Sequence, residues 1–171
     1  MTAPDPFDAA RARLAAAPRE ALGELLAPRR LLGLARAPRI VRRGSAWHLG
    51  VLLLTDDAVL ATGDIIRARQ QARRGYTAES QRRRAELAAA ARRGGFAEGE
   101  TVHIGWRVLD PAAPAADDTG AASARPAEAS GPLVFADGSL FVRWSTTGGL
   151  VPLESYLAER VGLLLDPPAG A

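Results

Sequence analysis

The chain contains no cysteine, no lysine and no asparagine, and the first two absences each remove a class of chemistry. Without cysteine there can be no disulfide, no thiolate metal ligand and no cysteine nucleophile. Without lysine there can be no phosphate-binding G-x-x-x-x-G-K-[ST] loop, no Schiff base and no S-x-x-K serine mechanism. The motifs G-x-G-x-x-G, G-x-S-x-G and H-E-x-x-H are also missing. Several large enzyme classes are therefore excluded, and the sequence predicts neither a cofactor nor a bound metal.

Long apolar runs are also missing. The longest strongly apolar stretch is LGVLLL, far short of the roughly 20 residues that span a bilayer. The first residues carry acids at Asp5 and Asp8 and no apolar segment of the secretory type. These features predict a cytoplasmic protein with no membrane partner.

All 22 basic residues are arginine. Lysine and asparagine are both encoded by A-rich codons, so their joint absence indicates a GC-biased genome, and arginine partly stands in for lysine. The charge is nevertheless divided: residues 1–95 carry 18 arginines and 9 acids, whereas residues 96–171 carry 4 arginines and 10 acids. This division predicts either an anionic partner or two halves that attract one another.

The length of 171 residues fits a single domain. Residues 1–43 read as a helical arm. Asp5 and Pro6 are typical of a helix start, which predicts a helix to about Ala17, and the leucines between the prolines of residues 18–43 predict two short helices.

The rest of the chain alternates strand and helix signals. AWHLGVLLL and AVLATGDIIRA predict a hairpin that turns at TDD, TVHIGWRVLD predicts a third strand, and PLVFADGSLFVRWS predicts a second hairpin that turns at Asp137–Gly138. Helices are expected from Thr77 to Arg93 and over residues 151–166, and residues 111–131 read as a flexible loop. The predicted class is α+β, with an antiparallel sheet of about five strands and N-terminal, central and C-terminal helices.

Residues 73–95 hold seven arginines and two acids. The arginines do not form one stripe at helical spacing, and Glu79 is placed to pair with Arg83. A solvated helix that packs through alanine is therefore the favoured interpretation. The alternative is non-specific nucleic-acid binding through the arginine-rich segments 29–43 and 73–93, with Arg82, Arg92 and Arg93 on one arc of the helix.

Four side chains on the predicted strands form a second candidate site. If strand alternation buries the three indole rings, then His48, His103, Arg107 and Arg143 share the opposite face of the sheet. Two imidazoles and two guanidinium groups on one face would bind an anion or supply a general base. The simpler interpretation is that the histidines make structural hydrogen bonds beneath a packed helix. The expected face for burial carries Trp47, Trp106 and Trp144.

The stretches WHLGVLLL, RRGGFAEGE, GPLV, VRWS and LVPLESYLAERV together resemble a group of short arginine-rich proteins from high-GC bacteria. The resemblance covers nearly the whole chain except residues 111–131. Some members of that group carry the label glutaminase, which implies a small amide hydrolase. Glutaminases of familiar types use a lysine-assisted serine, a cysteine or a threonine nucleophile. This chain lacks the lysine and the cysteine that two of those mechanisms require, and the resemblance transfers no catalytic residue.

The sequence therefore predicts a non-enzymatic binding domain for a small anionic ligand, a protein partner or its own copy. The two alternatives are nucleic-acid binding and an amide or ester hydrolase with His48 or His103 as the base.

Overall fold

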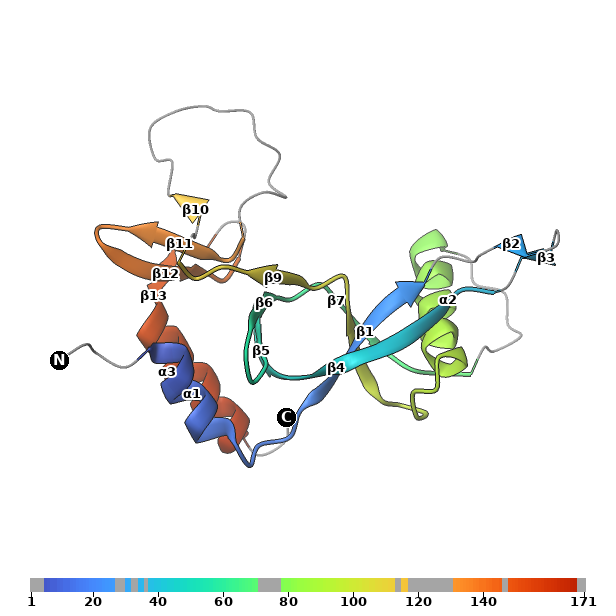
Figure 1. Cartoon of the computed structure of the whole chain (residues 1–171), viewed down its shortest axis with the longest axis horizontal. Helices are drawn as coiled ribbons and strands as arrows, with labels where there is room; N and C mark the ends of the chain where they lie inside the picture. Colours follow the sequence, from blue (N-terminus) through green and yellow to red (C-terminus); the bar gives the residue numbers. More distant parts are fainter. Residues whose placement is uncertain are drawn as a thin grey trace. The chain divides into compact units, whose positions relative to one another are not determined.

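The structure is a computed structural model that describes residues 5–26, 30–31, 34–35, 37–70, 78–112, 115–116, 131–145 and 148–168. The class is α+β, as predicted, but these ranges contain thirteen strands rather than about five. None of the helices in the described ranges is long and apolar enough to cross a membrane. The elements are α1 (Pro6–Leu14), β1 (Glu20–Leu26), β2 (Arg30–Leu31), β3 (Leu34–Ala35), β4 (Arg39–Leu49), β5 (Leu52–Leu54), β6 (Val59–Ala61), β7 (Asp64–Arg67), α2 (Glu79–Arg93), β8 (Thr101–Ile104), β9 (Arg107–Leu109), β10 (Ala115–Ala116), β11 (Leu133–Ala136), β12 (Ser139–Arg143), β13 (Leu150–Pro152) and α3 (Leu153–Leu165) (Figure 1).

Contacts group the chain into two compact units, where the sequence predicted one domain. Unit 1 comprises residues 1–18, 47–61 and 107–171, and unit 2 comprises residues 19–46 and 62–106. Seven strands pair in the order β7-β8-β1-β4-β5-β6-β9, four pair in the order β10-β11-β12-β13, and β2 pairs with β3. Most neighbours are antiparallel, while β1 with β8 and β10 with β11 are parallel. Each unit is described by itself below.

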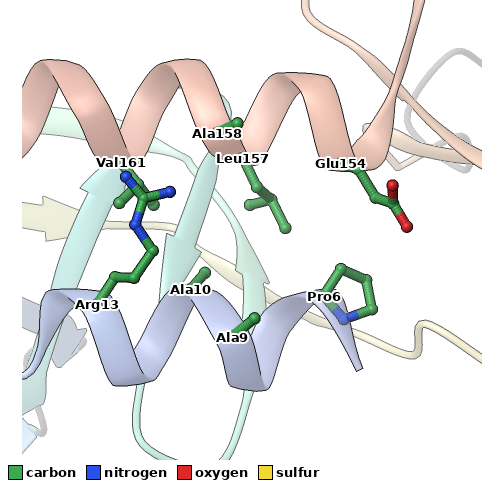
Figure 2. A pocket seen from close by; sticks show the side chains of 8 residues that line it. All are labelled: Pro6, Ala9, Ala10, Arg13, Glu154, Leu157, Ala158 and Val161. Atoms are coloured by element: carbon green, nitrogen blue, oxygen red, sulfur yellow. The ribbon is translucent and has the colours of Figure 1, made fainter. Parts of the chain in front are cut away.

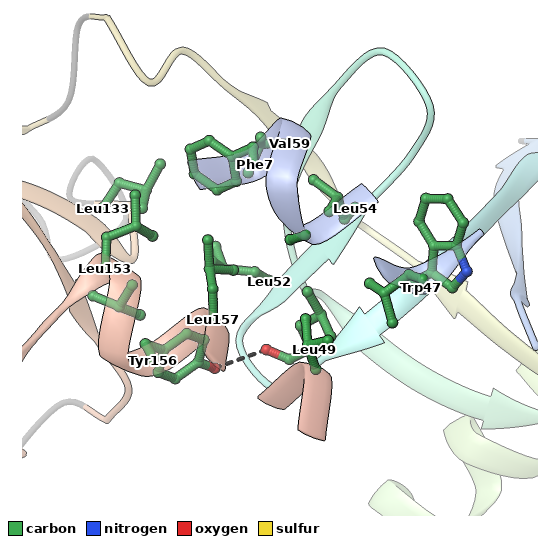
Figure 3. Packing of buried hydrophobic residues seen from close by; sticks show 14 residues of the cluster. Phe7, Trp47, Leu49, Leu52, Leu54, Val59, Leu133, Leu153, Tyr156 and Leu157 are labelled. Carbon is green, nitrogen blue, oxygen red and sulfur yellow. Dashed lines mark hydrogen bonds between the residues drawn. The ribbon is translucent and has the colours of Figure 1, made fainter. Parts of the chain in front are cut away.

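Unit 1 has a core between α1, α3 and strands β4, β5, β6, β11 and β12 (Figure 3). The side-chain carboxylate of Asp5 accepts a hydrogen bond from the amide of Phe7 at 2.8 Å, which confirms the predicted helix start. The predicted apolar stripe of the last helix is also confirmed, because α3 buries Leu153, Leu157 and Val161. The helices α1 and α3 lie side by side.

The first predicted hairpin is confirmed with its turn at TDD, because β5 and β6 pair antiparallel and Leu54 lies opposite Val59. A further and earlier turn was not predicted. The chain reverses at Gly50–Val51, so that Leu49 pairs with Leu52 and Trp47 pairs with Leu54. Gly50 has a φ of +70°, which fits the first central position of a type II′ turn, where glycine is preferred. Because the turn comes early, Leu52 and Leu54, rather than Leu53, share the core of unit 1 with Trp47.

The hydroxyl of Tyr156 on α3 holds this turn. It donates to the carbonyl of Leu49 at 2.8 Å, drawn as a dashed line in Figure 3, and accepts from the amide of Val51 at 3.0 Å. Tyr156 is buried, and a Cβ at position 50 would lie 2.5 Å from its hydroxyl oxygen. The absence of a side chain at Gly50 therefore lets α3 reach the backbone of the turn.

The second predicted hairpin is confirmed. β11 and β12 pair antiparallel, and Asp137 and Gly138 both have positive φ angles, of 49° and 76°. β10 adds to β11, and β13 leads directly into α3. Most of the predicted loop 111–131 lies outside the described residues.

Unit 2 places α2 on the strands β7, β8, β1 and β4. The helix packs through Ala89, Ala90 and Ala91, which confirms the expectation of an alanine-packed helix. Gly94 ends the helix as predicted, and a Cβ there would lie 1.5 Å from the carbonyl oxygen of Ile40. The predicted cap Thr77 lies outside the described residues.

The two short helices expected in residues 18–43 are wrong. Residues 20–26 form β1, which pairs with β4 and β8, and β4 begins at Arg39. Gly23 explains the difference, because a Cβ there would lie 2.5 Å from Ile40 Cγ2 and 2.7 Å from Val102 Cγ1. Close strand packing on a residue with poor helix propensity overrides the helical spacing of the leucines.

The predicted third strand is two strands. β8 ends at Ile104, Gly105 turns the backbone with a φ of +68°, and β9 begins at Arg107. β8 lies in unit 2 and β9 in unit 1.

The three indole rings do not share one buried face. Trp47 is buried in unit 1 and donates to the carbonyl of Ala17 at 3.2 Å, while Trp106 is partly buried in unit 2 and donates to the carbonyl of Gly23 at 3.1 Å. Trp144 is 50% exposed. The predicted burial of all three rings is therefore wrong for Trp144.

Candidate functional site

The four residues of the predicted ligand face are divided between the two units. His103 belongs to unit 2, whereas His48, Arg107 and Arg143 belong to unit 1. Arg107 is on β9 of the seven-stranded sheet, and Arg143 is on β12 of the four-stranded sheet. The common ligand face of these four residues therefore stays a prediction.

Both histidines make contacts inside their own units. His103 has no exposed surface, and its Nε2 lies 2.5 Å from a carboxylate oxygen of Glu20. Both faces of β8 are covered at this point, which strand alternation alone does not reveal. His48 is partly buried, and its Nε2 lies 3.0 Å from the carbonyl oxygen of Gly50.

A different set of charged residues lines a groove of about 510 Å³ in unit 2, between β7 and α2. Arginines from β7, from just after it and from α2 lie around it, and none of the described residues that line it is an aspartate or glutamate. We call it the arginine groove. Its lining residues are Ile65, Ile66, Arg67, Arg69, Gln81, Arg84, Ala85 and Ala88.

The strand side of the arginine groove follows from the pleat. Ile66 and Ala68 point into the core of unit 2, so the alternate residues Arg67 and Arg69 are exposed. The amide of Arg69 donates to the carbonyl of Ala88 on α2 at 3.2 Å, which fixes the end of this segment beside the helix. Both guanidinium groups therefore project from a backbone that is held in place.

The helix side follows from the helical repeat. Gln81, Arg84, Ala85 and Ala88 are spaced i, i+3, i+4 and i+7, which places them on one face. Glu86 is about 200° around the helix from Arg84 and faces away. The small side chains of Ala85 and Ala88 leave the groove open, while Gln81 and Arg84 supply hydrogen-bond donors.

The acidic residues of unit 2 are largely engaged with other cations. Glu24 pairs with Arg43, Glu79 with Arg82, Glu98 with Arg92, and Glu100 with Arg42, while Glu20 contacts His103. By contrast, Arg67, Arg69 and Arg84 make no side-chain hydrogen bond or ion pair with the described part of the chain. Three uncompensated guanidinium groups thus surround one groove.

The arginines singled out for nucleic-acid binding have structural contacts instead. Arg82 pairs with Glu79, so the predicted pairing of Glu79 with Arg83 is wrong. Arg92 bonds to the carbonyl of Phe96 and to Glu98, and Arg93 donates to the carbonyl of Pro38 at 2.9 Å. None of the three lines the arginine groove.

Within segments 29–43 and 73–93, Arg84 lines the arginine groove, and other arginines have contacts elsewhere. Arg42 pairs with Glu100 and stacks over Phe96, Arg43 pairs with Glu24, and Arg39 is exposed. The positions 29, 36, 73 and 74 lie outside the described residues. The informative signal was IIRAR, residues 65–69, in which Arg67 at the end of β7 and Arg69 just after it are exposed while Ile66 and Ala68 are buried.

Unit 1 contains a smaller groove between α1 and α3. Figure 2 shows Ala10 and Leu157 at its floor, with Arg13 and Glu154 at opposite ends. Its volume is about 240 Å³, below the roughly 300 Å³ at which ligand pockets begin. We attribute this groove to the packing of two helices through small residues.

Comparisons with family models, with curated proteins and with solved structures gave no match for this chain. The resemblance to arginine-rich bacterial proteins consequently stays a prediction.

Proposed function

We propose that this protein is a binding protein for an anionic ligand and that the ligand binds in the arginine groove of unit 2. The observation that supports this most is the set of three guanidinium groups, from Arg67, Arg69 and Arg84, around one groove with no acid among its lining residues. Folding alone does not account for this arrangement, because like charges that face a common groove repel one another.

The chemistry of the groove favours oxyanions such as phosphates. A guanidinium group presents a planar set of donors that matches two oxygens of a phosphate or carboxylate, and the amide of Gln81 adds a further donor. Ile65 and the two alanines form apolar walls, which lower the local dielectric and strengthen these charge-assisted bonds.

The test is a calorimetric titration with inorganic tripolyphosphate at low salt. We expect the double variant R67Q/R84Q to weaken binding roughly tenfold or more, because two charge-assisted contacts are lost. The matched control R39Q/R83Q removes the same charge from two exposed arginines of unit 2 that lie outside the groove. Equal losses in both variants, or no loss in either, would show that the groove does not bind the anion.

The hydrolase alternative has one favourable contact, between His103 and Glu20. A carboxylate beside an imidazole is the arrangement that orients a general base. His103 has no exposed surface, however, and a base must reach the proton that it removes. We therefore do not extend the proposal to hydrolysis.

A further inference from the structure

We infer that the ligand of the arginine groove is the sugar–phosphate backbone of a double-stranded nucleic acid, bound without regard to base sequence. This inference rests on the proposed function and names its ligand class. Three features support it: the positions of the groove arginines, the kinds of side chain among the described lining residues, and the net positive charge of unit 2.

The three arginines of the groove come from different backbone positions. Arg67 ends β7, Arg69 follows two residues later, at most about 7 Å away along the chain, and Arg84 comes from α2. A single small anion can be enclosed by converging donors. Donors distributed along two elements suit a ligand whose negative charges repeat along its length, as they do in a phosphodiester chain.

Among the described residues, the lining of the groove has no side chain of the kind on which a single-strand binder stacks bases. Proteins that bind single strands stack bases on aromatic side chains, and each stack contributes about 1–3 kcal/mol. None of the eight lining residues is aromatic. A rigid duplex needs no stacking platform and presents a higher charge density than a flexible single strand, so the groove favours the duplex.

We also do not expect the groove to recognise a particular base sequence. Specific readout depends on several polar side chains that reach base edges in a groove of the duplex. Here Gln81 is the one uncharged polar side chain among the lining residues, and it lies beside arginines that bind phosphates. The groove arginines would therefore contact phosphates, which position the duplex without distinguishing one base pair from another.

The charge of unit 2 supports the same ligand. Its residue ranges hold sixteen arginines and seven acidic residues, a net charge of +9, whereas those of unit 1 hold six arginines and twelve acidic residues, a net charge of −6. The chain's excess of positive charge thus lies in the unit that contains the groove. A field of this sign steers a polyanion toward unit 2 before any specific contact forms.

The experiment is fluorescence anisotropy of the full chain with a short labelled duplex, and with one of its strands alone, over a series of salt concentrations. We expect the duplex to bind more tightly than the strand. We also expect R67Q/R84Q to reduce the slope of log K against log salt by about 2, because each lost phosphate contact removes about 0.9 from the slope. The control R39Q/R83Q should change the slope by less than half as much.

Three results would overturn the inference. They are no binding of the duplex at low salt, tighter binding of the single strand than of the duplex, and equal changes in the slope of log K against log salt in R67Q/R84Q and R39Q/R83Q. If tripolyphosphate binding still depends on Arg67 and Arg84 in such a case, the proposed function stands and only the ligand class is wrong. If R67Q/R84Q changes the binding of neither tripolyphosphate nor the duplex, the proposed function fails as well.

Discussion

At the scale of single residues, the hydroxyl of Tyr156 makes the most consequential contact of unit 1. It joins α3 to both sides of the turn at Gly50 through two hydrogen bonds in a buried setting. We predict that Tyr156→Phe lowers the free energy of unfolding by about 1–3 kcal/mol, because a buried carbonyl and amide lose their partner. Urea denaturation measures this loss, with Ser155→Ala on the exposed face as the control.

A second substitution separates the hydrogen bonds from the steric fit. Gly50→Ala strains a φ of +70° and brings a Cβ to 2.5 Å from the Tyr156 oxygen. In the double variant the oxygen is gone, so the combined loss should be smaller than the sum of the two single losses. Strict additivity would mean that the two residues do not act through this contact.

Other single-residue features could be predicted from the sequence, and the reason is local chemistry. Asp5 as the helix cap, Asp137–Gly138 as the turn and Gly94 as the helix end each depend on a few neighbouring atoms. The pairing of Glu79 was predicted one position too far along the helix, because i,i+3 and i,i+4 partners are both within reach.

At the scale of elements, ion pairs connect segments that are distant in the sequence. Arg42 on β4 lies 2.5 Å from the carboxylate of Glu100, just before β8, and also stacks over Phe96. The hydrogen bond from the Arg42 side chain, aided by one from the amide of Ala97, holds the pKa of Glu100 below its ordinary value.

This lowered pKa predicts the direction of a pH effect. A carboxyl whose pKa is lower in the folded state stabilises the fold above its unfolded pKa, and that contribution is lost as the pH falls through the folded value. We expect acid to destabilise the chain from about pH 4.5 downward, and Arg42→Gln to reduce this dependence. Thermal unfolding between pH 3 and pH 7 measures it, and an unchanged pH profile in the variant would contradict the assignment.

Elements were harder to predict where long-range pairing decides. Residues 20–26 have leucines at helical spacing, yet they pair with a strand on either side, and the close approach of Ile40 and Val102 leaves no room for a side chain at Gly23. The helices α1 and α3 were predictable because the apolar residues at helical spacing are the ones that they bury. The strand at 101–110 was read as continuous because the turn at Gly105 has no further signal beside it.

At the scale of the whole molecule, the sequence showed the charge division but not its cause. A cut at residue 95 separates a basic half from an acidic half, and the two structural units, which are discontinuous in sequence, have net charges of +9 and −6. The arginine groove was not predicted. Which arginines are paired with acids depends on contacts between distant strands, and the count of arginines alone does not separate paired residues from unpaired ones.

The most direct test of the account is a two-dimensional nitrogen–proton NMR titration of the full chain with a short duplex. If the duplex binds in the arginine groove, the largest chemical-shift changes occur at the backbone amides of Arg67, Arg69, Gln81 and Arg84. These changes disappear in R67Q/R84Q but persist in R39Q/R83Q. Changes centred on unit 1, or spread evenly over all exposed arginines, would contradict it.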